Sequence, residues 1–314
     1  MKAEPIVTLT MNPAIDMGVS VEKMVSEHKM RCIKTRRDPG GGGINVARVL
    51  KRFGGDPLAI FPTGGSSGHM LERLVAAEEV RHQSFMISRD CRANFTANEI
   101  STGQQYRFVL PGPTMSEEEW TAGLGLMTAA TSTGYAVASG SVPRGVPDDF
   151  YARLARNLRV SGGGRLVLDT SGPPLKKALD MGCYLVKPSL SEFAEFLGDR
   201  EPSQDACLEA CKTLVTNGKA EIVALTMGPD GAMLTSRDVS IYAKPPPVTV
   251  RGTVGAGDSF LALLVLSLAQ RQSLKDAFRL ACAAGAAALV SPGTGLASPD
   301  VVKQLAAQVE IKTL

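Results

Sequence analysis

The chain of 314 residues is 44% hydrophobic and 21% charged, so it can bury a large core, as one large domain or two small ones. Its formal charge of +3 is spread along the chain, which argues against a nucleic-acid-binding surface, and the longest basic run, Lys34-Thr35-Arg36-Arg37, is interpreted as a solvated strand end. The six scattered cysteines lack a C-x-x-C pair and the three histidines do not cluster with them, so we expect free thiols in a reducing cytoplasm, without a zinc site or a disulfide framework.

The beginning of the chain and its most apolar segment predict no secretion signal and no membrane span. Met1 to Pro5 lead directly into a short strand pattern rather than a longer apolar stretch. The longest apolar run, Phe260 to Ala269, is far short of the roughly 20 residues that cross a bilayer. We therefore expect a core helix there and a cytoplasmic protein.

Short β-branched or apolar runs alternate with helical patterns along the chain. Strands are predicted at Ile6–Thr10, Leu58–Phe61, Tyr135–Ser139, Leu166–Asp169, Tyr184–Lys187 and Ile222–Thr226. Apolar residues at three- and four-residue spacing predict amphipathic helices at Met70–Val80, Asp148–Leu158, Ser191–Leu197 and Ser203–Val215. This alternation predicts an α/β fold of βαβ units, with a mainly parallel sheet covered by helices on both faces.

Two segments, residues 18–37 and 93–110, interrupt this alternation. Both mix polar with β-forming residues, and the second continues into Gln104–Leu110 after the turn Ser101-Thr102-Gly103. We expect a small antiparallel sheet, separate from the main one, that forms a lid or an interface. A pair of surface hairpins without a role fits the pattern equally well.

A glycine-rich turn near the C-terminus, Thr253-Val254-Gly255-Ala256-Gly257-Asp258-Ser259, leads directly into the long apolar helix. The first amides of a helix are unpaired and lie at the positive end of its dipole, so this segment predicts an anion site. Asp258 adds a carboxylate within reach of an acceptor hydroxyl. A helix capped by Asp258 or Ser259 explains the segment equally well.

Three familiar motif classes are excluded. No G-x-x-x-x-G-K-[ST] sequence is present, and no G-x-G-x-x-G follows the first strand, which excludes a P-loop enzyme and a typical Rossmann dehydrogenase. Gly64-Gly65-Ser66-Ser67-Gly68 matches G-x-S-x-G formally, but the only later histidines, His69 and His82, lie too close to complete a hydrolase triad. We interpret Gly64–Gly68 as a tight turn between a strand and a helix.

A second glycine-rich segment, Pro39 to Arg48, also opens a helix and places Asn45 at its start. Four successive glycines cost backbone entropy, so we interpret them as a place where a ligand approaches the backbone closely. Asp16 follows the first strand, at the edge where open α/β sheets bind ligands, although on its own it would be interpreted as a turn carboxylate in water.

Together these segments resemble the ribokinase-like (PfkB) carbohydrate kinase family, nearest to its minor, bacterial-type 6-phosphofructokinase branch. The resemblance covers nearly the whole chain and implies one three-layer α/β/α domain over residues 1–314, with a β-sheet lid from about 18–37 and 93–110 that also forms a homodimer interface. The matching motifs are Thr8-Leu9-Thr10-x-Asn12-Pro13-Ala14-x-Asp16, Pro39-Gly40-Gly41-Gly42-Gly43-Ile44-Asn45-Val46-Ala47-Arg48, Gln105-Tyr106-Arg107-Phe108-Val109, Ser139-Gly140-Ser141-Val142-Pro143, Val186-Lys187-Pro188 and Thr253-Val254-Gly255-Ala256-Gly257-Asp258-Ser259.

The resemblance also implies roles for individual residues. Asp258 matches the family's catalytic base, and the amides of Gly255, Ala256 and Gly257 match its anion hole. The positions implied for the sugar are Asp16, Gly41, Gly42 and Asn45; those near the sugar phosphate are Arg92 and Ser141, with Lys29 and Arg31 where a lid reaches that site, in the same subunit or across the dimer; those for the nucleotide are Lys187, Ser189, Thr226, Gly228, Gly231 and Thr253.

One motif departs from the family pattern. The family usually carries Asn-x-x-Glu after the Lys-Pro pair, whereas this chain has Ser189-Leu190-Ser191-Glu192. Glu192 is expected to help hold Mg²⁺ through water, and the shorter Ser189 is expected to weaken a metal or phosphate contact. The sequence leaves open whether K⁺ or another monovalent cation activates near Thr253 and Ser291, and whether excess ATP inhibits.

The activity implied is transfer of the γ-phosphate of ATP to the 1-hydroxyl of fructose 6-phosphate. This expectation rests on Gly42, where relatives acting on fructose 1-phosphate or tagatose 6-phosphate often carry lysine. The alternatives are 1-phosphofructokinase or tagatose-6-phosphate kinase and, from a different class, a non-catalytic regulator that binds a sugar phosphate. The intact segment Gly255–Asp258 favours an enzyme.

Overall fold

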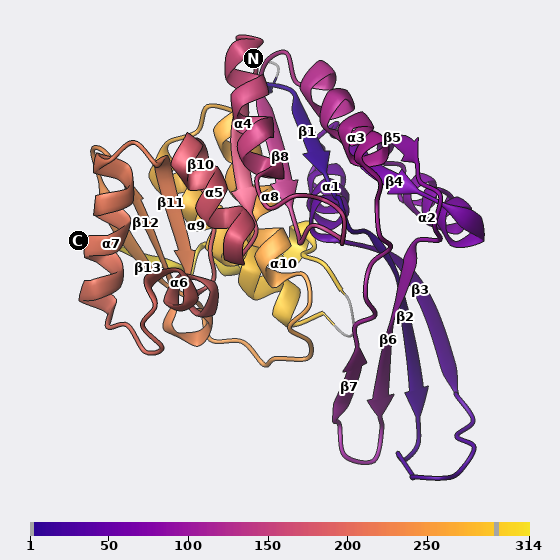
Figure 1. Cartoon of the computed structure of the whole chain (residues 1–314). Coiled ribbons are helices and arrows are strands. Elements are labelled where there is room, and N and C mark those ends of the chain that lie inside the picture. Colours follow the sequence, from indigo (N-terminus) through magenta and orange to yellow (C-terminus); the bar gives the residue numbers. More distant parts are fainter. Residues whose placement is uncertain (1–2, 292–294) are drawn as a thin grey trace.

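Two β-sheets organise the chain in a computed structural model, which describes residues 3–291 and 295–314 (Figure 1). Within those ranges the main sheet has ten strands in the order β14-β13-β12-β11-β10-β9-β8-β1-β4-β5. Every pair from β11 to β5 is parallel, while β12, β13 and β14 continue the sheet in antiparallel fashion. The strands are β1 (Ile6–Leu9), β4 (Leu58–Thr63), β5 (Arg81–Met86), β8 (Tyr135–Ser139), β9 (Arg165–Asp169), β10 (Cys183–Val186), β11 (Ala220–Thr226), β12 (Ala232–Ser236), β13 (Ser240–Lys244) and β14 (Glu310–Thr313).

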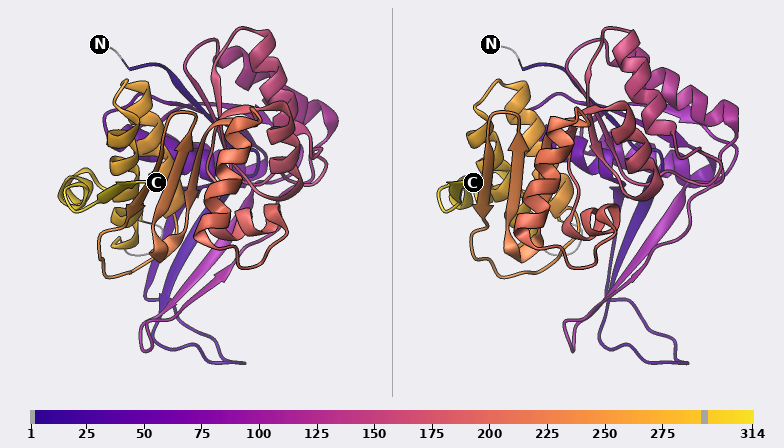
Figure 2. Two further views of the ribbon diagram at one scale, coloured as in Figure 1. Left: turned by 90° about the vertical axis from the view of Figure 1, so that its left-hand side faces the viewer. Right: turned by 60° about the vertical axis from the view of Figure 1, so that its left-hand side comes forward.

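Helices cover both faces of this sheet, which gives the three-layer α/β/α arrangement (Figure 2). Alternate residues of a strand point to opposite faces, so Tyr135 and Val137 enter one core while Ala136 and Ala138 enter the other. The first core and the base of the lid pack against α1 (Gly42–Arg52), α2 (Gly65–Ala77), α8 (Ala256–Ala269), α9 (Leu274–Leu289) and α10 (Pro299–Ala306); the second packs against α3 (Glu117–Ala130), α4 (Phe150–Val160), α5 (Gly172–Met181), α6 (Leu190–Leu197) and α7 (Gln204–Thr216).

The six strands and four helices predicted from the sequence are present, with shifted ends. The largest shift is at α2, which begins at Gly65 rather than Met70 and ends at Ala77 rather than Val80. The turn predicted over Gly64–Gly68 is therefore mostly the first turn of the helix, where the Gly68 amide donates to the Gly64 carbonyl over 2.9 Å. A Cβ on Gly68 would lie 3.0 Å from the carbonyl carbon of Thr63, so glycine lets this helix start against the strand end.

A second sheet of four strands, in the order β3-β2-β6-β7, extends from the body as a lid (Figures 1 and 2). Its strands are β2 (Ala14–Val21), β3 (Lys34–Gly40), β6 (Arg92–Glu99) and β7 (Gln105–Phe108). The two hairpins are antiparallel, but their neighbouring strands β2 and β6 pair in parallel, so the prediction of an antiparallel sheet was wrong on this point. Both hairpins leave the body through their first strand, and those two outgoing strands lie side by side.

The long apolar segment forms α8, whose residues from Ser259 to Ser267 are all buried. It packs against α9 and α1 in the core, as expected for a central helix. In the part of the chain that the structure describes, no helix is both long and apolar enough to cross a membrane.

Candidate active site

The carboxyl ends of the parallel strands meet the first turns of α1 and α8. Asp169 ends β9, Lys187 follows β10, and Thr226 ends β11. Across this edge the Nδ2 atom of Asn45 donates to Oδ2 of Asp258 over 2.9 Å, which joins residues 213 positions apart in the sequence. Open α/β sheets bind their ligands at this edge, so the structure gathers the candidate residues where a ligand site is expected.

The start of α8 is built to receive an anion. Gly255 is its N-cap residue, with φ of 77°, and makes no side-chain cap hydrogen bond in the described structure. The first bond of the helix runs from the Ser259 amide to the Gly255 carbonyl over 2.8 Å, which leaves the preceding amides without partners within the helix. The alternative in which Asp258 or Ser259 caps this helix is therefore not what the chain adopts.

Asp258 lies in that first turn and is only partly accessible to solvent. Burial raises the pKa of Asp258 to about 7, and the Asp169 carboxylate adds to the rise. The hydrogen bond from Asn45 and the charge of Lys187 act in the opposite direction, while Asp16 raises the pKa further. A carboxyl group with a pKa near neutrality can take up and release a proton under physiological conditions, as a general base must.

An ion pair lies next to this turn. Nζ of Lys187 is 3.0 Å from Oδ1 of Asp169, and the two side chains are only 5% and 13% exposed. Burial acts to lower the pKa of Lys187, but the carboxylates of Asp169 and Glu192 outweigh it and the pKa is raised, so the lysine is charged. A Cβ on Gly257 would lie 3.4 Å from Nζ, which places this positive charge beside the amides at the start of α8.

The glycines before α1 adjoin the protein's own strands. A Cβ on Gly42 would lie 2.1 Å from Oγ of Ser139, and one on Gly43 would lie 2.5 Å from the carbonyl oxygen of Leu9. Gly41 has φ of 113° and would meet the side chain of Thr10. Close approach to a ligand, the interpretation made from the sequence, therefore does not by itself explain the four glycines, because these three let α1 begin against the ends of β1 and β8.

Asp16 is the third residue of β2, at the base of the lid. Asn94, directly across from it on β6, donates a 2.9 Å hydrogen bond from Nδ2 to its Oδ1. Burial raises the pKa of Asp16 above its ordinary value of 3.8, although this bond and the charge of Arg92 oppose the rise. A Cβ on Gly40 would meet Oδ2 of Asp16 at 2.2 Å, so glycine is also required on the facing strand.

Arg92 begins β6 and reaches back to the body. Its two Nη atoms donate to the carbonyl oxygens of Asn12 and Leu110, each over 3.0 Å. Its Nε is buried and has no partner among the residues described. The Nδ2 atom of Asn12 in turn donates to Oγ of Ser141 over 3.1 Å. Asn12 thus contacts both Arg92 and Ser141, the two residues that the resemblance assigns to the sugar phosphate.

Ser189 and Glu192 form a capping box at the start of α6. The amide and the hydroxyl of Ser189 both donate to Oε2 of Glu192, over 2.7 and 2.8 Å, and the Ser189 hydroxyl accepts from the Glu192 amide. A bridge joins Ser189 to Thr226, so the ends of β10 and β11 lie together. Gly228 opens the short 3₁₀ turn that follows β11, Gly231 closes it with φ of 93°, and Thr253 is exposed just before α8.

Two candidates lie away from these groups. Lys29 and Arg31 are exposed in the loop between β2 and β3, at the far end of the lid (Figure 1). The sequence analysis missed Asp169 and Asn94, which contact candidate residues directly. A signal for Asp169 was available, because it is a carboxylate at the carboxyl end of a predicted strand, the same position that drew attention to Asp16.

Comparisons with known proteins identify the family of the chain. A family model described as pfkB family carbohydrate kinase matches residues 5–301. An ATP-dependent 6-phosphofructokinase isozyme 2 from Mycobacterium tuberculosis (strain ATCC 25618 / H37Rv) is 42% identical over 300 residues, covering 95% of this chain and 88% of the relative. A relative of the same name from Escherichia coli (strain K12) is 36% identical over 301 residues, covering 96% and 97%.

A more distant relative and a solved structure complete the comparison. The 1-phosphofructokinase of Bacillus subtilis (strain 168) is 32% identical over 309 residues, covering 98% of this chain and 100% of the relative. The crystal structure of phosphofructokinase-2 from Escherichia coli in complex with potassium matches with a TM-score of 0.93 at 36% identity, covering 97% and 98%. The fold and the family match define a carbohydrate kinase. The chain belongs to the pfkB family and is an ATP-dependent sugar phosphotransferase.

Proposed function

We propose that the protein is an ATP-dependent 6-phosphofructokinase, which transfers the γ-phosphate of ATP to the 1-hydroxyl of fructose 6-phosphate. The relatives that carry this activity in their names are 36–42% identical, against 32% for the 1-phosphofructokinase. The observation that carries the mechanism is the first turn of α8, where Asp258, with a pKa of about 7, adjoins amides without helical partners.

In this proposal Asp258 accepts the proton of the sugar hydroxyl as the hydroxyl oxygen bonds to the γ-phosphorus of ATP and the bond from that phosphorus to the leaving ADP breaks. The amides of Gly255, Ala256 and Gly257 receive the negative charge of the transferring phosphoryl group, and the charged Lys187 next to them adds to that stabilisation. Phosphoryl transfer depends chiefly on positioning and charge neutralisation, so these donors and the base account for the chemistry that the protein must supply.

The sugar phosphate is proposed to bind between the lid and the body. Asp16 and Asn45 would hold sugar hydroxyls, with the backbone of Gly41 and Gly42 beside them. Arg92 and Ser141 would hold the phosphate, and the buried, unpartnered Nε of Arg92 supplies a donor for it. The Escherichia coli phosphofructokinase-2 has been solved in complex with fructose-6-phosphate, which supports this class of substrate.

ATP is proposed to lie over the ends of β10 and β11, against Lys187, Ser189, Thr226, Gly228, Gly231 and Thr253. Mg²⁺ would accompany its phosphates and neutralise their charge. The described residues form no cluster of three metal-binding side chains, which fits an ion held mainly by phosphates and water, as Mg²⁺ commonly is. Both bonds from Ser189 go to Oε2 of Glu192, which leaves Oε1 of that carboxylate for a metal-bound water.

The lid is proposed to form a homodimer interface. It carries exposed apolar side chains, among them Ile33, Phe108 and Val109, which are 59%, 54% and 64% exposed. Apolar surface of this kind favours contact with a second protein surface. In a dimer, Lys29 and Arg31 of one subunit would reach the sugar phosphate of the other. A tetrameric inhibited form of the Escherichia coli phosphofructokinase-2 has been solved, so that relative assembles.

The test is a coupled ADP-release assay with Mg-ATP and, separately, fructose 6-phosphate, fructose 1-phosphate and tagatose 6-phosphate. We expect the highest kcat/KM with fructose 6-phosphate. Preference for another of the three would keep the chemistry and replace the substrate, giving the 1-phosphofructokinase or tagatose-6-phosphate kinase alternative. The absence of turnover with all three would favour a different acceptor or the non-catalytic regulator. The Escherichia coli phosphofructokinase-2 has been solved in complex with potassium, and K⁺ is a proposed activator here that the same assay can test.

A further inference from the structure

Arg48, one turn after Asn45 on α1, is an unusually buried cation. Its side chain is 1% exposed, and it is among the largest fully buried side chains in the described part of the chain. A buried charge is unfavourable unless it is paired and hydrogen-bonded, so the partners of Arg48 should reveal what the chain gains by keeping it there.

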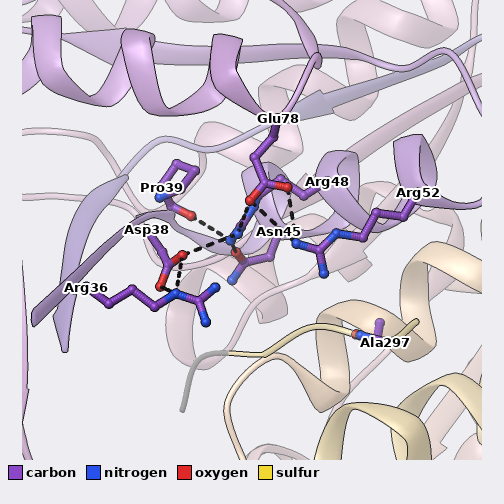
Figure 3. Close-up of polar contacts among 9 residues, drawn as sticks. Arg36, Asp38, Pro39, Asn45, Arg48, Arg52, Glu78 and Ala297 are labelled. Carbon is purple, nitrogen blue, oxygen red and sulfur yellow. Dashed lines mark hydrogen bonds and ion pairs between the residues drawn. The ribbon is translucent and has the colours of Figure 1, made fainter. Parts of the chain in front are cut away.

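Four groups from different parts of the fold surround Arg48 (Figure 3). Nη2 lies 2.5 Å from Oε1 of Glu78, at the end of α2, and 3.7 Å from Oδ1 of Asp38 on β3. Nη1 donates to the carbonyl oxygen of Pro39 over 3.0 Å and to Oδ1 of Asn45 over 3.2 Å. Arg48 therefore ties α2 and the base of the lid to one side-chain amide of the candidate site.

The chemistry of these groups fixes the orientation of that amide. A guanidinium can only donate hydrogen bonds, so the Asn45 atom that faces Arg48 must be the oxygen. The Nδ2 donor of Asn45 is thereby turned toward Oδ2 of Asp258, 2.9 Å away. The opposite orientation would set a donor against the guanidinium and a carbonyl oxygen against the carboxylate, so it is unfavourable at both ends.

We propose that Arg48, held by Glu78, is a positioning residue for phosphoryl transfer, because it fixes the Asn45 amide that hydrogen-bonds the base. The inference rests on the proposed function in that Asp258 is taken as the base. Arg48 itself does not touch the reacting groups. Its contribution is that the bond from Asn45 stabilises the charged form of Asp258, the form that accepts the proton.

The charges around Asp258 and Arg48 allow an electrostatic effect on the pKa of Asp258 to be distinguished from a change in the position of the Asn45 amide. Asp169, Lys187 and Asp16 act on Asp258 together with the bond from Asn45. Arg48 faces Glu78, which also pairs with Arg52, and Asp38, which also pairs with Arg36. Replacing Glu78 by glutamine removes a negative charge, which by itself would lower the pKa of Asp258. If the substitution instead displaces Arg48 and the Asn45 amide that Arg48 orients, the hydrogen bond to Asp258 weakens and the pKa of Asp258 rises.

The experiment compares Glu78→Gln and Arg48→Lys with Arg52→Ala, through the pH dependence of kcat/KM for fructose 6-phosphate and the melting temperature. Arg52 is the matched control, since it pairs with Oε2 of Glu78 over 3.1 Å but is 31% exposed and makes no bond to Asn45. In Glu78→Gln and Arg48→Lys we expect the acidic limb of the kcat/KM profile to move up by about 1 to 2 pH units, the equivalent of one lost hydrogen bond to a charged group. Arg52→Ala should keep the wild-type limb.

The inference would be overturned if the acidic limb of the kcat/KM profile in Glu78→Gln stays at the wild-type pH or moves to lower pH, even when the melting temperature falls. Arg48 would then be a purely structural residue. If Arg48→Lys fails to fold, Glu78→Gln decides alone, because it retains the size of the side chain. Failure of the proposed function looks different: wild type would then lack turnover with every sugar phosphate, or Asp258→Asn would keep full activity, and this inference would fall with it.

Discussion

Nζ of Lys187 lies 3.0 Å from Oδ1 of Asp169, in an ion pair between the ends of neighbouring strands and next to the first turn of α8. The pair has two consequences. The Asp169 carboxylate compensates the charge of the buried Lys187 side chain. The pair also keeps a positive charge where the phosphates of ATP are proposed to bind. Loss of either partner should therefore affect both stability and turnover.

Lys187→Met should lower the free energy of unfolding by about 3–5 kcal/mol, because it leaves the Asp169 carboxylate buried and unpaired. Lys219→Met is the control, since Lys219 pairs with Asp180 at 2.9 Å but the side chains are 36% and 68% exposed, and exposed pairs contribute about 0–1 kcal/mol. Chemical denaturation measures both. KM for ATP should rise only in Lys187→Met. Equal losses in the free energy of unfolding in the two variants would contradict the argument from burial.

The pKa of Asp258 predicts how activity and stability depend on pH. The base must be ionised, so kcat/KM for the sugar phosphate should fall as the pH drops below about 7. The folded chain also binds this proton more tightly than the unfolded chain, whose carboxyl has the ordinary value of 3.8, so wild type should gain stability from Asp258 as the pH falls from about 7 toward that value.

Thermal unfolding of wild type and Asp258→Asn across this range provides the check. The asparagine variant should melt higher than wild type at pH 8, because it lacks the buried charge, and the difference should shrink as the pH falls. A difference that stays constant from pH 8 to pH 5 would show that Asp258 titrates normally.

Arg92→Ala should raise KM for the sugar phosphate by a factor corresponding to about 1.5–3 kcal/mol, the value of a charged hydrogen bond, and leave KM for ATP unchanged. Arg89→Ala is the neighbouring control, because Arg89 is exposed. Steady-state kinetics with each substrate varied in turn decides the matter. A rise confined to KM for ATP would assign Arg92 to the nucleotide rather than to the sugar phosphate.

Phe108→Asp should convert the proposed dimer into monomers. Phe108 is 54% exposed and faces Phe95 on the neighbouring strand, so a carboxylate there would be desolvated in the interface. Val160→Asp on α4 is the control, since Val160 is 82% exposed on the body. Sedimentation velocity should detect the change in the lid variant alone. A wild-type protein that sediments as a monomer would remove the lid interface from the account.

The sequence predicted the fold well where signals were local. Alternating runs identified six central strands, and glycine-rich turns marked the starts of α1 and α8. It did not predict β12 and β13, which follow β11 as successive antiparallel strands, or β14 at the edge of the sheet. The pairing of β14 with β13 and the parallel pairing of β2 with β6 join segments far apart in the sequence, so local patterns do not reveal them.

The same limit applies to the site. Asp258, Asn45 and Asp16 stand in recognisable motifs. Asn94 was missed because its bond to Asp16 joins segments far apart in the sequence, and Asp169 was missed although its place at the end of a predicted strand was a signal. Arg48 stands in the same motif as Asn45, but the sequence does not show that its guanidinium is buried and bonded to that side chain. The glycines at 41–43 were attributed to ligand approach because a single sequence does not reveal that Thr10, Ser139 and Leu9 occupy the neighbouring space.

The most direct test of the central claim is the turnover of Asp258→Asn with Mg-ATP and fructose 6-phosphate, measured at pH 8 on folded protein. The substitution retains the shape of the side chain and the start of α8 but removes the base. We predict that kcat falls at least about 10²-fold while both KM values change little, as expected when a general base is lost. A variant that turns over at the wild-type rate would contradict the assignment of Asp258 as the base and, with it, the proposed mechanism.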